Sequence, residues 1–414
     1  MRVLVVNAGS SSLKLTLLDD EDATIASVTL PGALSGTGGD GNGNGDRDLD
    51  RDRGVLGEAL RSDLGEAIRS GFGEADVVGH RIVHGGEQYR DAVRIDAGVE
   101  AALRDLVELA PLHQPKSLAA LDAVTKLLPD LPRVACFDTA FHSTIPPAAA
   151  TYALPARWRE RFGLRRYGFH GLSHAWVARR APELLGLAPP QPRGPGALEP
   201  LDRSDAGGPL DRSATGPRIV SCHLGAGASL CAISGGVSLD TTMGFTPLEG
   251  LVMATRSGSV DPGLLLWLLE RGELSTSELA DALEHRSGLL GLAGSADMGE
   301  IVRRAEAKDA AASLALDVYV HRLCASIAAM AAALGGLEVL AFTGGVGEHC
   351  AAVRARAVAG VAFLGVCIDD ARNDDAHDDR EIGSDGAAVR TVVLGAREDL
   401  EMARQVRELL SGQA

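Results

Sequence analysis

The chain has 414 residues, of which 45% are hydrophobic, and this length and composition predict a globular protein of two or three domains. Its 40 Lys and Arg residues against 56 Asp and Glu residues give a formal net charge of −16, which argues against general binding to nucleic acid or to an anionic membrane. No apolar run of membrane-spanning length and no cleavable leader occurs, and the six cysteines have no CxxC spacing, so we expect a cytoplasmic protein with reduced cysteines.

The first eighteen residues contain two apolar runs with a polar segment, 7–12, between them. This pattern predicts a strand, a turn and a second strand. Small residues in the turn allow backbone N–H groups to approach an anion, while Asn7, Ser10 and Ser12 offer hydrogen bonds and Lys14 adds a positive charge. The segment therefore predicts either a phosphate-binding turn or an ordinary hairpin with a polar tip.

Short β-branched runs alternate with longer helical segments along the rest of the chain. We expect strands at 77–84, 133–138, 218–225, 338–345 and 390–395, and helices at 97–110, 115–128, 172–185, 262–285, 299–334 and 397–411. Alternating strands and helices predict an α/β fold whose sheets are covered by helices. Two segments rich in Gly, Pro and Asp, 32–54 and 188–217, are predicted to be flexible insertions without a catalytic role.

Two further small-residue turns follow apolar runs, one within 220–233 and one at 342–348. The first repeats the strand, turn and strand of the N-terminus, which suggests a duplicated domain. Three such turns favour nucleotide binding over three chance loops, although none of them matches a Walker A loop or a Rossmann fingerprint.

Two charged residues lie in or directly after predicted strands. Strand alternation places Arg81 and Val83 on one face, opposite His80, and this pair suits a small carboxylate with a short alkyl tail. The alternative is an exposed arginine whose stem covers apolar surface. Asp138 follows the run 133–137 and points to a ligand site or a metal, or else caps the following turn.

The remaining candidates lie in three other segments. His170 precedes a predicted helix with His174 four residues on, but no HExxH glutamate or third ligand follows, so donation to a phosphoryl group is favoured over zinc. The segment 240–263, which contains the single basic residue Arg256, is predicted to form the wall of a binding site. Glu398, in the first turn of the last helix, either caps that helix or holds Mg²⁺.

Taken together, these residues resemble the acetate kinase family, within the superfamily of acetate and sugar kinases, Hsc70 and actin. The resemblance rests on strings that run in family order from residue 3 to residue 404: VVNAGSSSLK, GHRIVHGG, LAPLH, FDTAFH, YGFHGLSH, HLGAGAS, DTTMGFTPLEGL, ATRSGSVDP, HRSGLLGLAG, FTGGVGE and EDLEMAR. It implies direct transfer of a phosphoryl group from ATP to acetate, dependent on Mg²⁺ or Mn²⁺, giving acetyl phosphate and ADP.

The resemblance also implies a role for individual residues. The catalytic set would be Arg81, Asp138, His170 and Arg256, and the pocket for acetate would be Arg81, Val83, Leu112, Phe169 and Pro247. Metal would be held by Asn7 and Glu398. The nucleotide would contact Ser10, Ser12, Lys14, His223, Gly225, Ala226, Gly227, Asp297, Met298, Gly299, Gly344, Gly345, Val346 and Gly347.

The implied architecture is two similar ribonuclease H-like domains of the actin-like ATPase type, with the active site in the cleft between them. Their expected boundaries are 1–143 and 144–396, with the helix 397–414 packed back on the first domain, and the family implies a homodimer. The chain departs from the family pattern, mainly on the nucleotide side, at Gln114, Leu172, Ala226, Gly299, which follows Met298, and His349. A propionate kinase and a non-catalytic nucleotide-binding relative are the alternatives to an acetate kinase.

Overall fold

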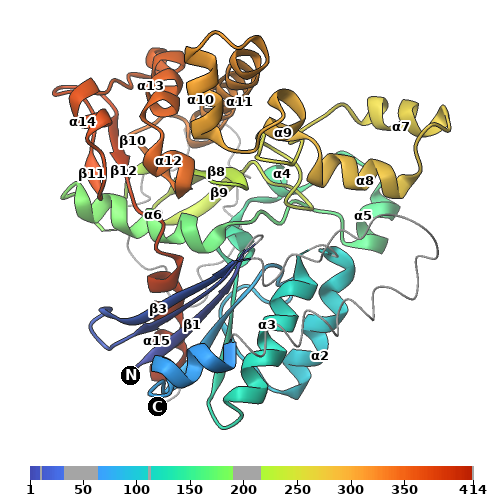
Figure 1. The fold of residues 1–414 in the computed structure, drawn as a ribbon, viewed down its shortest axis with the longest axis vertical. Helices are drawn as coiled ribbons and strands as arrows, with labels where there is room; N and C mark the ends of the chain where they lie inside the picture. Colours follow the sequence, from blue (N-terminus) through green and yellow to red (C-terminus); the bar gives the residue numbers. More distant parts are fainter. Residues whose placement is uncertain (10–11, 32–63, 111–112, 190–215, 413–414) are drawn as a thin grey trace, which may run out of the picture. The chain divides into compact units, whose positions relative to one another are not determined.

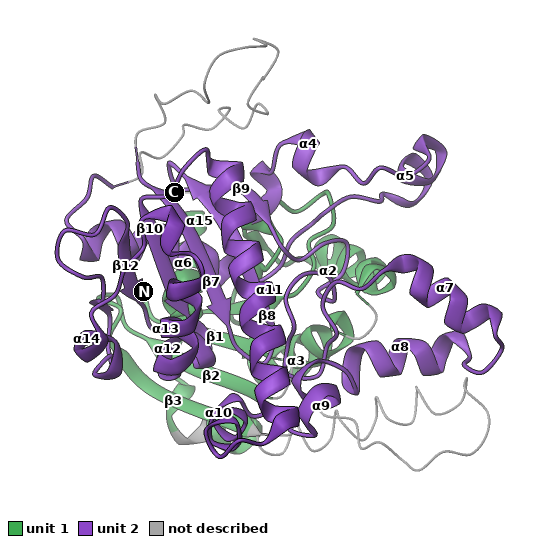
Figure 2. Cartoon of the chain, turned by 90° about the horizontal axis from the view of Figure 1, so that it is seen from above, with its two compact units in different colours: residues 1–141, 397–414 green, residues 142–396 purple. Residues whose placement is uncertain are grey.

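The computed structural model describes residues 1–9, 12–31, 64–110, 113–189 and 216–412. The chain divides into two compact units, unit 1 with Met1–Phe141 and Arg397–Ala414, and unit 2 with His142–Ala396 (Figures 1 and 2). The insertion predicted at 32–54 and most of the one at 188–217 lie outside the described residues.

Unit 1 is built on a six-stranded sheet of order β3-β2-β1-β4-β6-β5. Its strands are β1 (Val3–Ala8), β2 (Ser12–Leu18), β3 (Thr24–Pro31), β4 (Val77–Ile82), β5 (Val93–Arg94) and β6 (Arg133–Phe137). The first three form an antiparallel meander, β4 and β6 continue parallel to β1, and β5 pairs antiparallel with β6. The strand, turn and strand predicted at the N-terminus is therefore β1 and β2.

Helices pack on both faces of this sheet. They are α2 (Ala97–Asp105), α3 (Gln114–Leu127) and α15 (Glu398–Ser411), with the short helices η1 (Ile68–Phe72), η2 (Leu106–Leu109) and η3 (Ala140–Thr144) between elements. Val78 of β4 joins a core cluster with Val124 of α3. A Cβ on Gly79 would lie 3.0 Å from Val406 of α15, so the alternate residues of β4, including Arg81, face α15.

Unit 2 repeats the strand order of unit 1. Its sheet has the order β11-β12-β10-β7-β8-β9, built from β7 (Arg218–Leu224), β8 (Ala228–Ser234), β9 (Val237–Thr241), β10 (Val339–Thr343), β11 (Arg380–Glu381) and β12 (Arg390–Val393). The meander β7-β8-β9 is antiparallel, β10 and β12 are parallel to β7, and β11 closes the sheet antiparallel, as β5 does in unit 1. This confirms the predicted α/β fold with a duplicated sheet.

The helices of unit 2 differ from the predicted ones at two breaks. They are α4 (Pro147–Ala150), α5 (Ala156–Phe162), α6 (Gly171–Leu184), α7 (Pro262–Glu270), α8 (Thr276–His285), α9 (Gly288–Ala293), α10 (Met298–Glu306), α11 (Ala310–Leu334), α12 (Gly344–His349), α13 (Ala351–Gly360), η4 (Ala362–Leu364) and α14 (Asp370–Asp374). The single helix predicted at 262–285 was wrong, because Ser275 and Glu278 form a capping box that starts α8. The single helix predicted at 299–334 was also wrong, because Asp309 caps the start of α11.

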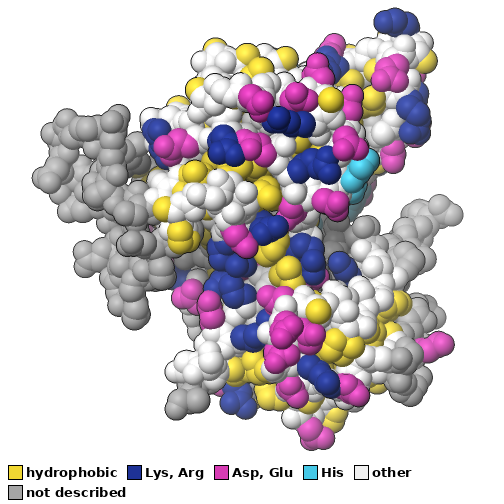
Figure 3. Space-filling model, turned by 90° about the vertical axis from the view of Figure 1, so that its left-hand side faces the viewer, with side chains coloured by type: hydrophobic (Ala, Val, Ile, Leu, Met, Phe, Trp, Pro, Cys, Tyr) yellow, Lys and Arg dark blue, Asp and Glu magenta, His cyan; other side chains and the backbone are white. Residues whose placement is uncertain are grey.

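Helix α11 is the only helix in the described part of the chain that is long and apolar enough to cross a membrane. It packs against β8, α9, α10 and α13 within unit 2, which is the environment of a core helix (Figure 2). On the face of the molecule in Figure 3, side chains of both charge signs are interspersed and hydrophobic side chains occur in small groups.

Candidate active site

The centre of the candidate site in unit 1 is Arg81, on β4. Its Nε donates to both carboxylate oxygens of Asp138, at 3.0 and 3.1 Å, and its Nη2 donates to Oδ2 at 2.6 Å. Asp138 follows the neighbouring parallel strand β6 and is only 2% exposed. Because β4 and β6 run parallel, the ends of both strands present these side chains at one edge of the sheet, which is where α/β sheets bind ligands.

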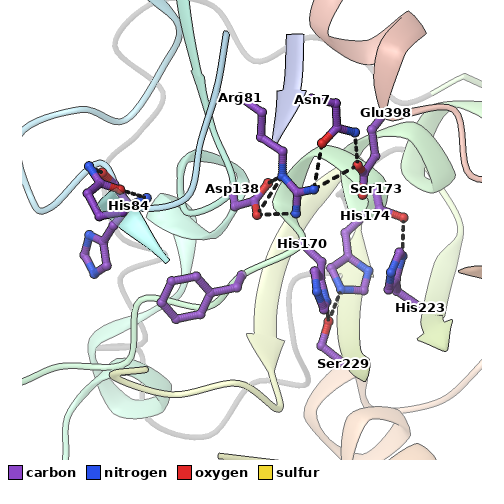
Figure 4. A network of polar contacts seen from close by, with 12 residues as sticks. Asn7, Arg81, His84, Asp138, His170, Ser173, His174, His223, Ser229 and Glu398 are labelled. Carbon is purple, nitrogen blue, oxygen red and sulfur yellow. Dashed lines mark hydrogen bonds and ion pairs between the residues drawn. The ribbon is translucent and has the colours of Figure 1, made fainter. Parts of the chain in front are cut away.

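Asn7 and Glu398 complete this group, which we call the Arg81 cluster: Asn7, Arg81, Asp138 and Glu398 (Figure 4). Nη1 of Arg81 donates to Oδ1 of Asn7 at 2.9 Å and lies 3.4 Å from Oε2 of Glu398, which also accepts from Nδ2 of Asn7 at 2.8 Å. Lys14 lies directly opposite Asn7 in the β1–β2 ladder, so its side chain projects from the same face. Five distant segments thus contribute to one face of unit 1.

Within the Arg81 cluster, the guanidinium of Arg81 keeps its positive charge. Burial lowers the pKa of Arg81, but the negative charges of Asp138 and Glu398 outweigh burial and raise it above its usual range. Burial raises the pKa of the Asp138 carboxyl, and the adjacent guanidinium opposes that rise. The paired geometry orients Arg81, so a carboxylate or phosphoryl ligand would meet a preorganised donor rather than a mobile one.

Magnesium fits the donor chemistry of the Arg81 cluster. Asp138, Glu398 and Asn7 supply carboxylate and amide oxygens, the ligands that Mg²⁺ prefers, and Mg²⁺ commonly needs only one or two protein carboxylates beside phosphate oxygens and water. Among the described residues, no group of three His, Cys, Asp or Glu side chains could hold a metal without such additional ligands.

The candidate site in unit 2 is formed by His170 and Arg256 around Gly227. His170 precedes α6, and Arg256 lies in the long segment before α7. A Cβ added to Gly227 would lie 2.5 Å from Nη2 of Arg256 and 3.2 Å from Nε2 of His170. Both side chains therefore border the same glycine, where only a residue without a side chain leaves them room.

Arg256 is a buried cation that has no carboxylate partner among the described residues. It is 8% exposed, its Nη1 donates to the carbonyl oxygen of Pro247 at 2.6 Å, and within the described residues it forms no ion pair. Burial lowers its pKa, and the more distant Glu284 counteracts this. Since a buried, unneutralised charge is costly, a bound anion would supply the missing counter-charge.

His170 is one end of a chain of hydrogen bonds, which we call the His170 chain: His170, Ser229, His174 and Ser221. Figure 4 shows the first three of these residues. Oγ of Ser229 lies 2.9 Å from Nδ1 of His170 and 2.9 Å from Nε2 of His174, and Nδ1 of His174 lies 2.9 Å from Oγ of Ser221. The zinc alternative for His170 and His174 therefore has no support among the described residues, because both nitrogens of His174 are bonded to serine hydroxyls.

The nucleotide-side turns of unit 2 lie next to one another. His223 and Thr343 are partners in the parallel β7–β10 ladder. Gly344 has a φ of +78°, and a Cβ there would lie 2.8 Å from the carbonyl oxygen of Leu224, so only glycine fits this approach. The hairpin tip after β7 is closed by a bond of 3.0 Å from the N–H of Gly225 to the oxygen of Gly227.

Comparison with known proteins identifies the family. The model of the Acetokinase family matches residues 2–191 and 205–404. The chain belongs to the acetokinase family. It is 40% identical to the acetate kinase of Nostoc punctiforme, over 99% of this chain and all of that one, and 42% identical to the acetate kinase of Leifsonia xyli, over 99% of each.

Solved structures of acetokinase relatives match the whole chain as well. The crystal structure of Porphyromonas gingivalis acetate kinase has a TM-score of 0.79 at 35% identity and covers 99% of each chain. A propionate kinase from Francisella tularensis has a TM-score of 0.77 at 29% identity and covers 98% of each. The predicted fold of two actin-like ATPase domains is confirmed by these matches.

The other residues that the family resemblance singled out lie in both units. Val83 is 8% exposed and lies in unit 1, whereas Phe169, 1% exposed, and the buried Pro247 lie in unit 2. Ser10 and Leu112 lie outside the described residues.

Three nucleotide candidates lie at the start of α10. The exposed Asp297 caps this helix through a bond of 2.6 Å from the N–H of Glu300. Met298 is buried in the helix and Gly299 is exposed. The role of these residues in nucleotide binding stays a prediction.

The sequence analysis missed two polar groups, one buried and one partly buried. Ser229 sits among apolar residues of β8, where nothing marks it as more than a core serine. Tyr152 donates to Oε2 of Glu249 at 2.6 Å and accepts from the N–H of Phe245 at 2.9 Å, and Arg166 donates to Oε1 of Glu249 at 3.0 Å. This second group holds the loop that carries Pro247.

Proposed function

We propose that this protein is an acetate kinase, which transfers the γ-phosphoryl group of ATP reversibly to acetate. The observation that carries the proposal is the pair of held arginines: Arg81, oriented by Asp138, and Arg256, buried without an ion-pair partner among the described residues. Arginines grip carboxylates and phosphoryl oxygens in a fixed geometry. Family membership and relatives printed as acetate kinases support the same reaction.

The chemistry requires little covalent work from the protein. A carboxylate oxygen of acetate attacks the γ-phosphorus in line, its bond to phosphorus forms as the bond to the β-phosphate oxygen breaks, and ADP leaves with that electron pair. No proton has to move. The residues therefore act by holding acetate and ATP and by stabilising charge on the migrating phosphoryl group.

The proposed roles of the individual residues are those that the family resemblance implies. Arg81 binds the acetate carboxylate, and Arg256 with His170 donates to the phosphoryl oxygens. The family resemblance assigns the methyl group of acetate to an apolar set of Val83, Leu112, Phe169 and Pro247. The turns at 223–227 and 344–347, together with Ser10, Ser12, Lys14 and the segment 297–299, bind ATP.

Magnesium would be held by Asn7 and Glu398, with Asp138 beside them. When bound, Mg²⁺ neutralises phosphate charge and orients the transferring group. Asp138 and Asn7 hold the Arg81 guanidinium in place before substrate arrives, so the donor needs no reorganisation at the moment of transfer.

A propionate kinase is the second candidate, supported by the match to the Francisella tularensis propionate kinase. One methylene in an apolar pocket changes specificity by only about 1–3 kcal/mol. An assay that traps acyl phosphate as the hydroxamate, run with acetate and propionate and with ATP and GTP, tests both. Higher kcat/KM for acetate supports the first proposal, higher kcat/KM for propionate the second, and no product from either acid supports a non-catalytic relative.

We also propose a cytoplasmic homodimer. The apolar helix α7 supports self-association, because it has no buried residue and Leu266 and Trp267 are 61% and 52% exposed. Sedimentation velocity of the wild type and of Leu266→Lys tests it, and a wild-type monomer at micromolar concentration would contradict it.

A further inference from the structure

Ser229 lies between the rings of two histidines, one of which borders the phosphoryl site. Its side chain is fully buried on β8. Its hydroxyl lies 2.9 Å from Nδ1 of His170 and 2.9 Å from Nε2 of His174. A hydroxyl has one hydrogen to donate, so it donates to one of these rings and accepts from the other.

The buried ring of His174 permits two arrangements of the His170 chain. Burial, with His142 and His223 nearby, lowers the pKa of His174 well below its usual value, so this ring is neutral and has one N–H. If that hydrogen is on Nε2, it is donated to Ser229, and Ser229 donates to Nδ1 of His170. If it is on Nδ1, it is donated to Ser221, Ser229 donates to His174, and Nδ1 of His170 must carry a hydrogen.

The two arrangements give His170 different capacities at Nε2. In the first, neutral His170 carries its hydrogen on Nε2, the nitrogen beside Gly227 and Arg256. In the second, neutral His170 has a lone pair at Nε2 and would repel an anionic phosphoryl oxygen. A neutral His170 that donates at Nε2 therefore requires the first arrangement.

We propose that Ser229 is a positioning residue that donates to Nδ1 of His170, so that neutral His170 presents an N–H at Nε2 to the migrating phosphoryl group. The relation of Ser229 to catalysis rests on the proposed kinase function, whereas the tautomer of His170 does not. Ser221 and His174 complete the chain by holding the hydrogen of His174 on Nε2.

The surroundings of His170 show why its ring needs this bond. The residue has a φ of +57°, a strained backbone for a side chain other than glycine, and its ring packs against His223 with centroids 4.4 Å apart. His223 is itself bonded at Nδ1 to Ser173, at 2.8 Å. Packing fixes the plane of the His170 ring, but only a hydrogen bond can choose between its two tautomers.

The tautomer can be measured without any turnover. In ¹⁵N-histidine-labelled protein, two-bond proton–nitrogen correlation spectra distinguish a protonated from an unprotonated ring nitrogen, and His170→Gln assigns the signals. We expect unprotonated Nδ1 and protonated Nε2 in the wild type, and a mixture of tautomers in Ser229→Ala. A wild-type Nδ1 that carries hydrogen, or an unchanged tautomer in Ser229→Ala, overturns the proposal.

Kinetics test the consequence for catalysis. Ser229→Ala should lower kcat about 10- to 100-fold with KM for acetate and ATP little changed, since misplacement of a catalytic group affects the transition state. Ser238→Ala is the matched control, because it also removes a buried serine bonded to a histidine, His142 at 2.9 Å, but leaves the His170 chain intact. Its kcat should stay within about threefold of the wild-type value, as expected for a site outside the reacting groups.

A double variant separates positioning from general destabilisation. Ser229→Ala should lower kcat no further in a His170→Ala background, because the serine acts through that ring. Additive losses overturn the proposal. A wild type that makes no acyl phosphate contradicts the proposed function instead, and the tautomer measurement then still decides the role of Ser229.

Discussion

Arg81 and Asp138 form a buried ion pair across two parallel strands, with Nη2 and Oδ2 2.6 Å apart. The side chain of Asp138 is 2% exposed and that of Arg81 12% exposed. Arg256 contrasts with this pair, because it is equally buried but has no carboxylate partner among the described residues. The two arginines therefore both have proposed roles in the reaction but opposite consequences for folding.

Arg81→Ala should lose both activity and stability. We expect kcat to fall about 10³- to 10⁵-fold, the range for loss of an arginine from a phosphoryl-transfer site. Removing one partner of a buried pair should also lower the free energy of unfolding by about 3–5 kcal/mol. Arg81→Lys keeps the charge without the bidentate geometry, and it should recover stability more than kcat. Steady-state kinetics and urea unfolding measure both, and wild-type turnover in Arg81→Ala would remove this residue from the mechanism.

Arg256→Met should lose activity while the fold remains as stable as the wild type. Its buried charge has no neutralising partner in the described structure, so replacing it with an apolar side chain of similar length relieves a desolvation cost. The lost bond to Pro247 limits the gain, and the free energy of unfolding should stay within about 1 kcal/mol of the wild-type value. A large loss of stability together with activity would show that Arg256 is structural.

Gly227→Ala should disable the site in unit 2 without unfolding it. The new Cβ would lie 2.5 Å from Nη2 of Arg256 and would displace the ends of two side chains rather than backbone. We expect kcat to fall about 100-fold, the effect of moving catalytic groups by roughly 1 Å. Gly73→Ala is the control, because nothing lies within 4 Å of its Cβ position. Equal kcat in the two variants would refute this reading of Gly227.

His80 should make the protein sensitive to acid. It lies on β4, both of its ring nitrogens are buried without a hydrogen-bond partner among the described residues, and burial, with the charge of Arg133, lowers its pKa to about 3. The unfolded chain takes up this proton near pH 6.5 and the folded one does not, so stability is full above pH 6.5 and is lost as the pH falls towards 3.

Below pH 6.5, His80 should lower the free energy of unfolding by about 1.4 kcal/mol for each pH unit. His80→Leu should remove this part of the pH dependence. The variant should therefore become more stable relative to the wild type as the pH falls from 6.5 to 5. Urea unfolding at pH 7.5, 6.0 and 5.0 measures it. The prediction is wrong if the free energies of unfolding of His80→Leu and the wild type differ by the same amount at all three pH values.

The sequence predicted the four members of the Arg81 cluster one by one, and the structure brings them together. Each stands at a strand or helix end, where alternation and capping patterns restrict its direction. Ser229 and Tyr152 were not predicted, because their partners come from elements far along the chain and their residue types are ordinary in a core. Which polar group a buried serine meets depends on packing between elements, and no local pattern contains that information.

The breaks within the helices predicted at 262–285 and 299–334 differ in how clearly the sequence indicates them. Ser275 and Glu278 have the spacing of a capping box and Gly272 has a φ of +68°, so the break before α8 had a signal in the sequence. The break before α11 uses Lys308 at a φ of +67°, a conformation that lysine rarely adopts. In the sequence, only the capping residue Asp309 indicates this break.

Tyr152→Phe should weaken acetate binding more than it slows transfer. The hydroxyl of Tyr152 bonds both Glu249 and the N–H of Phe245, on either side of Pro247, and without it the loop loses two anchors. Since this loop carries a wall of the proposed methyl pocket but no reacting group, we expect KM for acetate to rise about tenfold, or roughly 1.4 kcal/mol, with kcat within about threefold of the wild-type value. Tyr319→Phe is the control, because within the described structure the buried Tyr319 hydroxyl has no hydrogen-bond partner. A kcat loss in Tyr152→Phe at unchanged KM would place this loop in transfer itself rather than in acetate recognition.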